Sequence, residues 1–233
     1  MSAAVDYPVS LALQDFVPVL LTGAGAILLV RPIARTAPRA APTALAGAAL
    51  LLAGGLSKAV WKLVVALDGP DVQPMDKALF PLLALGFLVL AHALLSLPSP
   101  VPSPRGTTRR APPSWGFAAA WTLFAALSVV LRSTLPVMVL TVAAVTVCGV
   151  RLILLARAAK DTGAASAAGL WLLGMYVLGP LAGRPDQSVA LQWVEQSCNT
   201  LTQAALLVTA VRLARSLPGP APRLARLPGT VTP

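Results

Sequence analysis

Seven long hydrophobic segments, separated by polar or proline-rich connections, follow one another along the chain. A helix that crosses a bilayer needs about 20 mainly apolar residues. Lipid offers no partners to backbone polar groups, so an open strand is excluded. We therefore predict an all-α, polytopic membrane protein. Its seven-transmembrane-helix bundle would have spans at 10–30, 43–67, 79–97, 115–131, 135–155, 164–181 and 188–213.

Composition and charge placement support this interpretation and add an orientation. Hydrophobic residues make up 57% of the chain and charged residues 11%, far from the balance of a soluble domain. The net charge of +10 would suggest nucleic-acid binding in a soluble protein. However, thirteen of the 18 Lys and Arg residues lie near the ends of spans one, three, five and seven or in the connections that follow them. By the positive-inside rule, we predict a cell-membrane protein with an outside N-terminus, a cytoplasmic C-terminus, the lipid bilayer as partner and no nucleic acid.

The order of the segments indicates an internal duplication. FVPVLLTG at 16–23 corresponds to TLPVMVLTV at 134–142, and each places a proline early in a helix. SLPSPVPSPR at 96–105 corresponds to SLPGPAPR at 216–223. The matches keep their order along the chain, which is what a duplicated unit produces.

This duplication predicts a 3+1+3 parallel pseudo-repeat. Residues 1–98 would form the first three-helix half and 134–215 the second. A cytoplasmic linker rich in Pro and Arg, 99–114, and a linking helix, 115–133, would join them. A disordered cytoplasmic tail, 216–233, would follow. Parallel repeats are characteristic of transporters, which place the substrate site between the halves near the bilayer midplane.

The predicted topology resembles that of SWEET-type sugar carriers, which also have seven spans and an outside N-terminus. The resemblance covers topology alone, since the chain lacks their proline-glutamine loop motif, and it assigns no functional residue here. Rhodopsins and receptors share the same topology. Span seven contains no lysine, so a retinal Schiff base in the rhodopsin position is excluded.

Span seven carries a polar face. At 100° per residue, five polar side chains fall within an arc of about 100°: Gln192, Glu195, Gln196, Asn199 and Gln203. An ionisable residue in a span usually faces protein or a water-filled cavity, because exposure to lipid is costly. We therefore predict that this face lines an internal cavity that opens outward.

Two lysines of span two complete the candidate site. Lys58 and Lys62 lie one turn apart, and Lys58 lies at about the depth of Glu195, which predicts an ion pair between Lys58 and Glu195. Because the lysines outnumber Glu195, the site would attract a small polar or anionic solute. Gln14, Asp15 and Asp76 are expected at the membrane interface. The predicted substrate-binding residues are Glu195, Lys58, Lys62, Asn199, Gln203, Tyr176 and Trp61.

A small-solute transporter is the favoured function. The alternatives are a non-transporting membrane partner or assembly subunit and a seven-helix sensor, in which the polar groups serve only structural packing. A homo-oligomer or a membrane partner protein is a further predicted partner. The chain has one histidine, two cysteines and no HExxH motif or phosphate-binding glycine loop. We therefore predict no enzymatic activity, no catalytic residues, no metal site and no cofactor.

Overall fold

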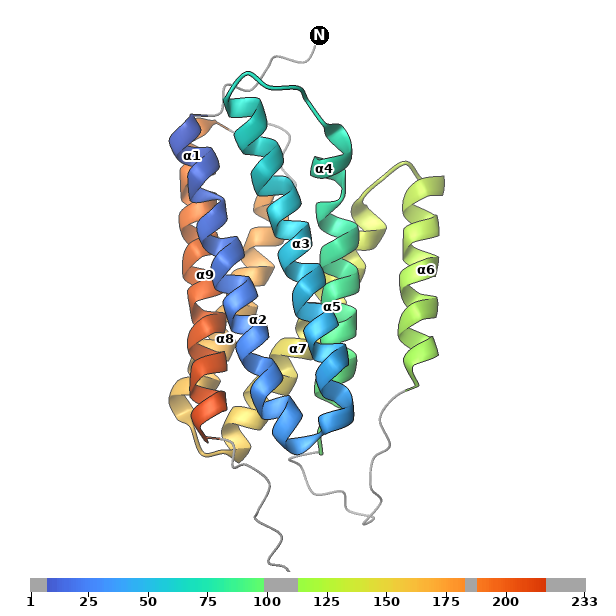
Figure 1. The fold of residues 1–233 in the computed structure, drawn as a ribbon, viewed down its shortest axis with the longest axis vertical. Helices are drawn as coiled ribbons and strands as arrows, with labels where there is room; N and C mark the ends of the chain where they lie inside the picture. Colours follow the sequence, from blue (N-terminus) through green and yellow to red (C-terminus); the bar gives the residue numbers. More distant parts are fainter. Residues whose placement is uncertain (1–7, 99–112, 183–187, 217–233) are drawn as a thin grey trace, which may run out of the picture.

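The computed structural model describes residues 8–98, 113–182 and 188–216, and every regular element in them is a helix (Figure 1). The predicted linker, 99–114, and tail, 216–233, lie almost entirely outside this part of the chain. The short elements are α1 (Val9–Gln14), the 3₁₀ turn η1 (Pro38–Ala40) and α4 (Gln73–Lys77). The long helices are α2 (Phe16–Thr36), α3 (Ala41–Ala66), α5 (Leu79–Leu95), α6 (Ser114–Val130), α7 (Leu135–Ala158), α8 (Thr162–Ala182) and α9 (Val189–Ser216).

Five helical segments of the described chain are long and apolar enough to cross a membrane: Val9–Thr36, Pro38–Ala66, Gln73–Leu95, Leu135–Ala158 and Thr162–Gly179. The all-α class is thus confirmed for the described residues, and a multi-pass membrane protein is supported. Helix α6, at 17 residues, is short for a crossing, and α9 has the length but carries the polar face. The seven-crossing bundle and the pseudo-repeat therefore stay predictions.

Six of the long helices form a closed ring. Each packs against the next in the order α2, α3, α5, α7, α8, α9, and α9 returns to pack on α2. Helix α6 packs from outside on α7 and α5, where it stands apart from the ring (Figure 1). No residue of α6 is buried. The ring, and not all seven long helices, therefore encloses the interior.

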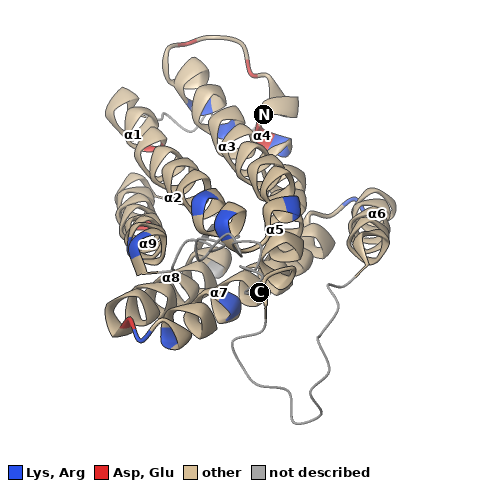
Figure 2. Cartoon of the chain, turned by 60° about the horizontal axis from the view of Figure 1, so that its bottom comes forward, with Lys and Arg blue, Asp and Glu red and all other residues tan. Residues whose placement is uncertain are grey.

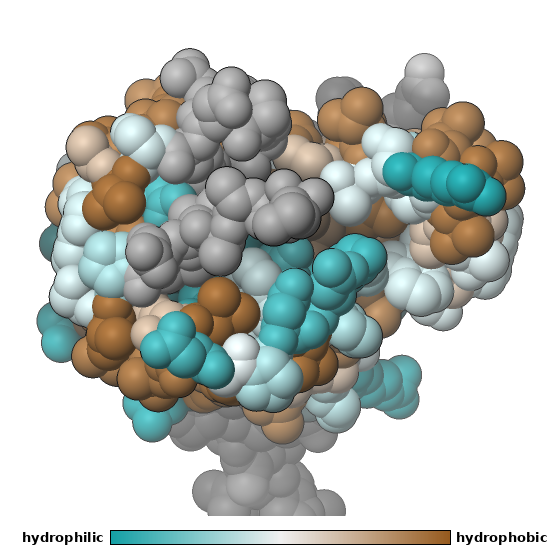
Figure 3. All heavy atoms as spheres, turned by 90° about the horizontal axis from the view of Figure 1, so that it is seen from above, coloured by the Kyte–Doolittle hydropathy of each residue, from teal (hydrophilic) through white to brown (hydrophobic). Residues whose placement is uncertain are grey.

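The two ends of the ring differ in charge. Helices α2, α5, α7 and α9 finish at one end, which we call the basic end because Lys and Arg gather there (Figure 2). The connection from α3 to α4 crosses the other end, which we call the acidic end after Asp68, Asp71 and Asp76. Seen from the acidic end, hydrophilic residues interrupt the apolar surface (Figure 3).

The half of the bundle next to the basic end is filled by alanine and leucine side chains. Ala44 and Ala48 of α3, Leu94 of α5 and Leu152 of α7 are each no more than 1% exposed. Close approach of the helices requires small residues: a Cβ at Gly47 would lie 3.0 Å from the Gly86 carbonyl oxygen across the α3–α5 contact. Membrane helices pack well through such residues, so the interior of the ring is densely packed in this half.

Two arginines fasten the ring near the basic end. The last carbonyl groups of a helix have no partner within it. The buried Arg151 of α7 donates hydrogen bonds to three carbonyl oxygens at and just beyond the end of α5, at 3.0 Å (Leu94), 2.6 Å (Leu97) and 2.8 Å (Pro98). Arg35 of α2 donates one, at 3.0 Å, to the Ala214 carbonyl near the end of α9. Each arginine joins two neighbouring helices of the ring.

Candidate functional site

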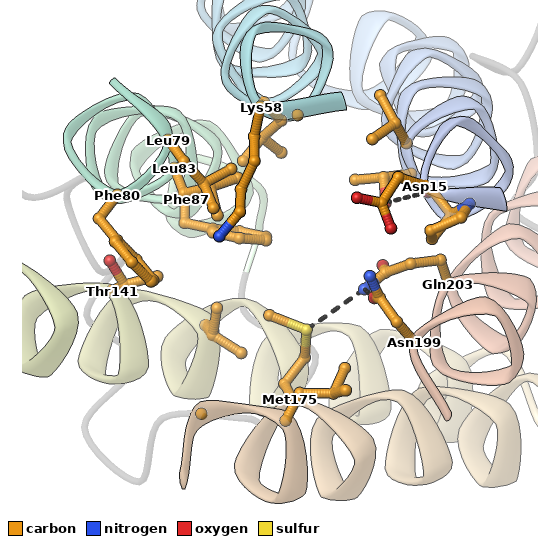
Figure 4. A pocket seen from close by; sticks show the side chains of 18 of the residues that line it. Asp15, Lys58, Leu79, Phe80, Leu83, Phe87, Thr141, Met175, Asn199 and Gln203 are labelled. Atoms are coloured by element: carbon orange, nitrogen blue, oxygen red, sulfur yellow. Dashed lines mark hydrogen bonds between the residues drawn. The ribbon is translucent and has the colours of Figure 1, made fainter. Parts of the chain in front are cut away.

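A cavity of about 210 Å³ lies inside the ring and extends from the acidic end toward the middle of the bundle. Residues of α2, α3, α5, α7, α8 and α9 line it, and among the described residues none comes from α6. Much of the wall is apolar, with Leu79, Leu83 and Phe87 of α5 on one side (Figure 4). A water molecule occupies about 30 Å³ in the liquid, so the space suits several waters or one small solute.

The most buried charges of the cavity are Asp15 and Lys62. Their side chains are 8% and 10% exposed, and Lys62 Nζ lies 2.6 Å from Asp15 Oδ2. Asp15 occupies the turn between α1 and α2, where the helix breaks for one residue. The expectation that Asp15 is interfacial is wrong, because Lys62 draws the carboxylate inward and both side chains line the cavity.

Asp15 could have been found from the sequence. It lies about five residues inside the outer end of the first predicted span, and Lys62 lies about five residues inside the same end of the second. The same depth count that matched Lys58 to Glu195 therefore matches Lys62 to Asp15. A count restricted to polar residues deep in the spans does not reach Asp15.

Lys58 projects into the cavity from α3 (Figure 4). Its ion pair is with Asp76, at 3.8 Å, and not with Glu195 as predicted. Asp76 reaches Lys58 because α4 folds over α3, where Ser57 Oγ donates a hydrogen bond of 2.8 Å to the Met75 carbonyl oxygen. Glu195 lines the same cavity and interacts with Lys58 electrostatically at longer range.

The polar face of α9 points inward, as predicted. Glu195, Gln196, Asn199 and Gln203 all line the cavity. Gln203 Nε2 donates to Asn199 Oδ1 at 3.1 Å, and Gln203 Oε1 accepts from Trp171 Nε1 at 3.4 Å. Gln196 is 7% exposed, and its Oε1 has no hydrogen-bond partner among the residues that the structure describes. Polar groups thus continue from the charged part of the cavity toward its floor.

The two predicted aromatic residues have different positions. Tyr176 of α8 lines the cavity, and its hydroxyl lies 2.7 Å from that of Thr146 on α7. Trp61 does not line it, and its Nε1 donates to Asp71 Oδ1 at 2.8 Å. At 100° per residue, Trp61 lies about 60° from Lys58 on the side away from Lys62, so it faces the α3–α4 connection.

The charges that line the cavity balance. Lys58 and Lys62 are matched by Asp15 and Glu195, so the excess of positive charge that motivated an anionic solute disappears. Among the residues that the structure describes, no group of three or more His, Cys, Asp or Glu side chains comes together in a way that could hold a metal ion. No protein-family model, curated protein or solved structure matches the chain.

Proposed function

We propose that the protein is a seven-span transporter that binds a small solute in the ring cavity and exposes it alternately to the two sides of the membrane. The observation that carries this proposal is one cavity, lined by three long helices from each predicted half, that holds ionisable side chains within a lipid-embedded chain. Such side chains in a span usually mark a substrate or ion pathway. The proposal includes no catalytic step.

The ring supports the 3+1+3 pseudo-repeat. Helices α2, α3 and α5 stand in sequence along one side and α7, α8 and α9 along the other, so the halves meet at two seams, α2 with α9 and α5 with α7. One arginine crosses each seam near the basic end, Arg35 from the first helix of its half and Arg151 from the first helix of the other. Helix α6, outside the ring, fits the role of a linking helix.

The polarity of α9 is compatible with a crossing. Its polar residues face the cavity, while Val194, Leu201 and Val208 are 54%, 72% and 48% exposed and would contact lipid. We propose that the protein lies in the cell membrane, with the basic end on the cytoplasmic side and the N-terminus outside. The cavity would then face the outside while the dense half closes the cytoplasmic side.

Cysteine labelling in intact cells tests this orientation. A membrane-impermeant maleimide should label Asp71→Cys in the α3–α4 connection and leave Lys160→Cys, at the end of α7, unlabelled until the membrane is opened. Background labelling of the native cysteines should be low, because Cys148 is fully buried and Cys198 is half-buried in α9. Labelling of Lys160→Cys alone in intact cells would reverse the assignment.

A non-transporting subunit or sensor is the alternative drawn from the sequence. It requires the polar face of α9 to contact a partner chain from the lipid side. That face lines the internal cavity instead, which favours transport.

A flux assay tests the proposal. A thermal-shift screen of the purified protein against metabolites, ions and lipids identifies a solute, and proteoliposomes then measure its transport. Glu195→Gln and Lys58→Met should each lower flux at least tenfold, because each removes a charge from the cavity without a large change in shape. The control is Asp161→Asn, at the α7–α8 connection of the basic end, which should transport normally. Full flux in both cavity variants would contradict the transport proposal.

A further inference from the structure

We infer that the cavity binds a small amphoteric solute of the α-amino-acid class, with its acid group at Lys58 and its ammonium group at Asp15. The inference rests on the proposed function, since it names the kind of solute that this cavity would carry. Three features of the described residues carry it: an ammonium group without hydrogen-bond acceptors, two buried acceptors without donors, and their placement around one space.

Lys58 supplies the cationic wall. Its Nζ points into the open space from α3 (Figure 4). A lysine ammonium group has three hydrogen-bond donors, and the one ion pair of Lys58 in the described chain, with Asp76, is 3.8 Å long. That distance exceeds a hydrogen bond. Lys58 therefore keeps its donors available for an anionic group inside the cavity.

Asp15 supplies the anionic wall from the opposite side of the same space (Figure 4). Its Oδ2 holds Lys62, but its Oδ1 is buried and has no hydrogen-bond partner in the described part of the chain. A carboxylate can accept about four hydrogen bonds, and leaving a buried acceptor without a donor is unfavourable. The unfilled oxygen therefore favours a donor group that enters the cavity.

Gln196 adds a second acceptor from α9. Its Oε1 is buried without a partner, and the residue lines the same cavity. The α1–α2 turn lies against α9 here, because Gln14 Nε2 donates to Thr200 Oγ1 at 3.1 Å. An ammonium group, with three N–H donors, suits a place that offers several acceptors and a negative charge.

The charge balance argues against a solute with a single charge. A simple anion that reached Lys58 would also meet the carboxylates of Asp15 and Glu195, and a simple cation at Asp15 would meet Lys58 and Lys62. Like charges at short distance in a low-dielectric interior repel strongly. A solute that carries both charges satisfies both walls. Its body would contact the apolar wall of Leu79, Leu83 and Phe87.

Binding measurements on the full-length protein in lipid nanodiscs test this assignment. The natural L-α-amino acids are titrated calorimetrically, and each one that binds is compared with its amide, which lacks the acid group, and its N-acetyl derivative, which lacks the ammonium group. Each analogue should bind at least tenfold more weakly than its parent. This comparison uses the unaltered protein, so it does not depend on any variant that fails to fold.

Two variants assign the two walls separately. Lys58→Met should weaken binding of the parent amino acid and leave binding of its amide unchanged, so that the two affinities differ by no more than about threefold. Asp15→Asn should weaken binding of the parent and leave binding of its N-acetyl derivative unchanged, with the same result. Asp161→Asn, far from the cavity at the basic end, serves as the matched control and should keep the tenfold preferences.

The outcomes separate this inference from the proposed function. If no amino acid binds but a sugar or an inorganic anion binds and is transported, the amphoteric assignment is overturned and the transporter proposal stands. Equal binding of a parent and both of its analogues also overturns the assignment. If no solute in the wider screen binds or crosses the membrane, and the cavity holds only water, both proposals fail.

Discussion

The two halves of the ring are built from the same helices but are packed in opposite ways. Toward the basic end, alanine, glycine and leucine side chains fill the space between helices, and Leu94 and Leu152 are each 1% exposed. Toward the acidic end, the same helices surround a cavity of about 210 Å³ that contains two lysines and two carboxylates. A single long helix can therefore supply dense packing at one end and a polar wall at the other.

Helix α5 shows how this difference arises. Near the basic end it packs on α3 at Gly47 and on α7 through Arg151. Near the acidic end it presents leucine and phenylalanine side chains to an open space. Departures from close packing in otherwise consistent proteins concentrate at functional sites. The cavity half is therefore the half to alter for function, and the dense half is the half to alter for stability.

The largest effect should come from breaking the buried ion pair. Lys62→Met should lower the free energy of unfolding by about 3–5 kcal/mol, because it leaves the Asp15 carboxylate buried without its counter-ion. Equilibrium unfolding in mixed micelles measures this change. The double variant Asp15→Asn/Lys62→Met should recover a large part of the loss. A double variant that unfolds as easily as the single one would mean that the pair is not the cause.

A matched pair of leucines on α5 compares the packing of the two halves directly. Leu94→Ala should cost about 2–4 kcal/mol, because the dense half cannot collapse around the space that it leaves. Leu83→Ala, on the cavity wall, should cost about 2 kcal/mol or less, because empty space already lies beside it. The same unfolding assay serves both variants. Equal losses would show that the cavity half is as tightly packed as the other.

The two arginine fastenings should differ in strength. Arg151→Met should cost about 2–3 kcal/mol, because it removes the charge-assisted hydrogen bonds of a buried arginine, including those to the buried Leu94 and Leu97. Arg35→Met should cost about 1 kcal/mol or less, because Arg35 makes one hydrogen bond at an exposed position. Thermal unfolding of the two variants in one detergent gives the comparison. The reverse order would contradict this description of the seams.

The smallest effect concerns pH at the basic end. Asp161 accepts a hydrogen bond from Arg212 and caps the start of α8 through the Ala164 N–H, and these contacts hold its pKa below the ordinary value of 3.8. Because the pKa is lowered in the folded state, the stabilisation is present above pH 3.8 and is lost as the pH falls through the folded-state pKa. The difference in unfolding temperature between the wild type and Asp161→Asn should therefore shrink in acid. A constant difference would exclude this origin.

Much of the fold could be predicted from the sequence. The hydrophobic segments correspond to long helices whose ends fall close to the predicted ones, for example α3 at Ala41–Ala66 for the segment 43–67. Hydropathy sets where a helix can lie, so it finds helices well. It does not set which helices are neighbours, and the ring with α6 outside it follows from side-chain packing that a single sequence does not reveal.

The candidate site was predicted unevenly for similar reasons. The face of α9 followed from the 100° period, and its inward direction is confirmed. The predicted pairing of Lys58 with Glu195 is wrong, because the observed contact with Asp76 depends on how α4 folds over α3. The prediction grouped Trp61 with the face of span two that carries Lys58 and Lys62, although its angle on the helix turns it away from Lys62. Depth and angle can be counted from sequence, but contacts between helices cannot.

The unequal arginine fastenings carry a consequence for movement. A step that opens the proposed transporter to the cytoplasm would have to separate the halves near the basic end. There the buried Arg151 donates to three carbonyl oxygens, and Arg35 makes a single exposed hydrogen bond. The α2–α9 contact would yield before the α5–α7 contact. The two halves would then rotate about the α5–α7 contact, where Arg151 lies, and separate at the α2–α9 contact, where Arg35 lies.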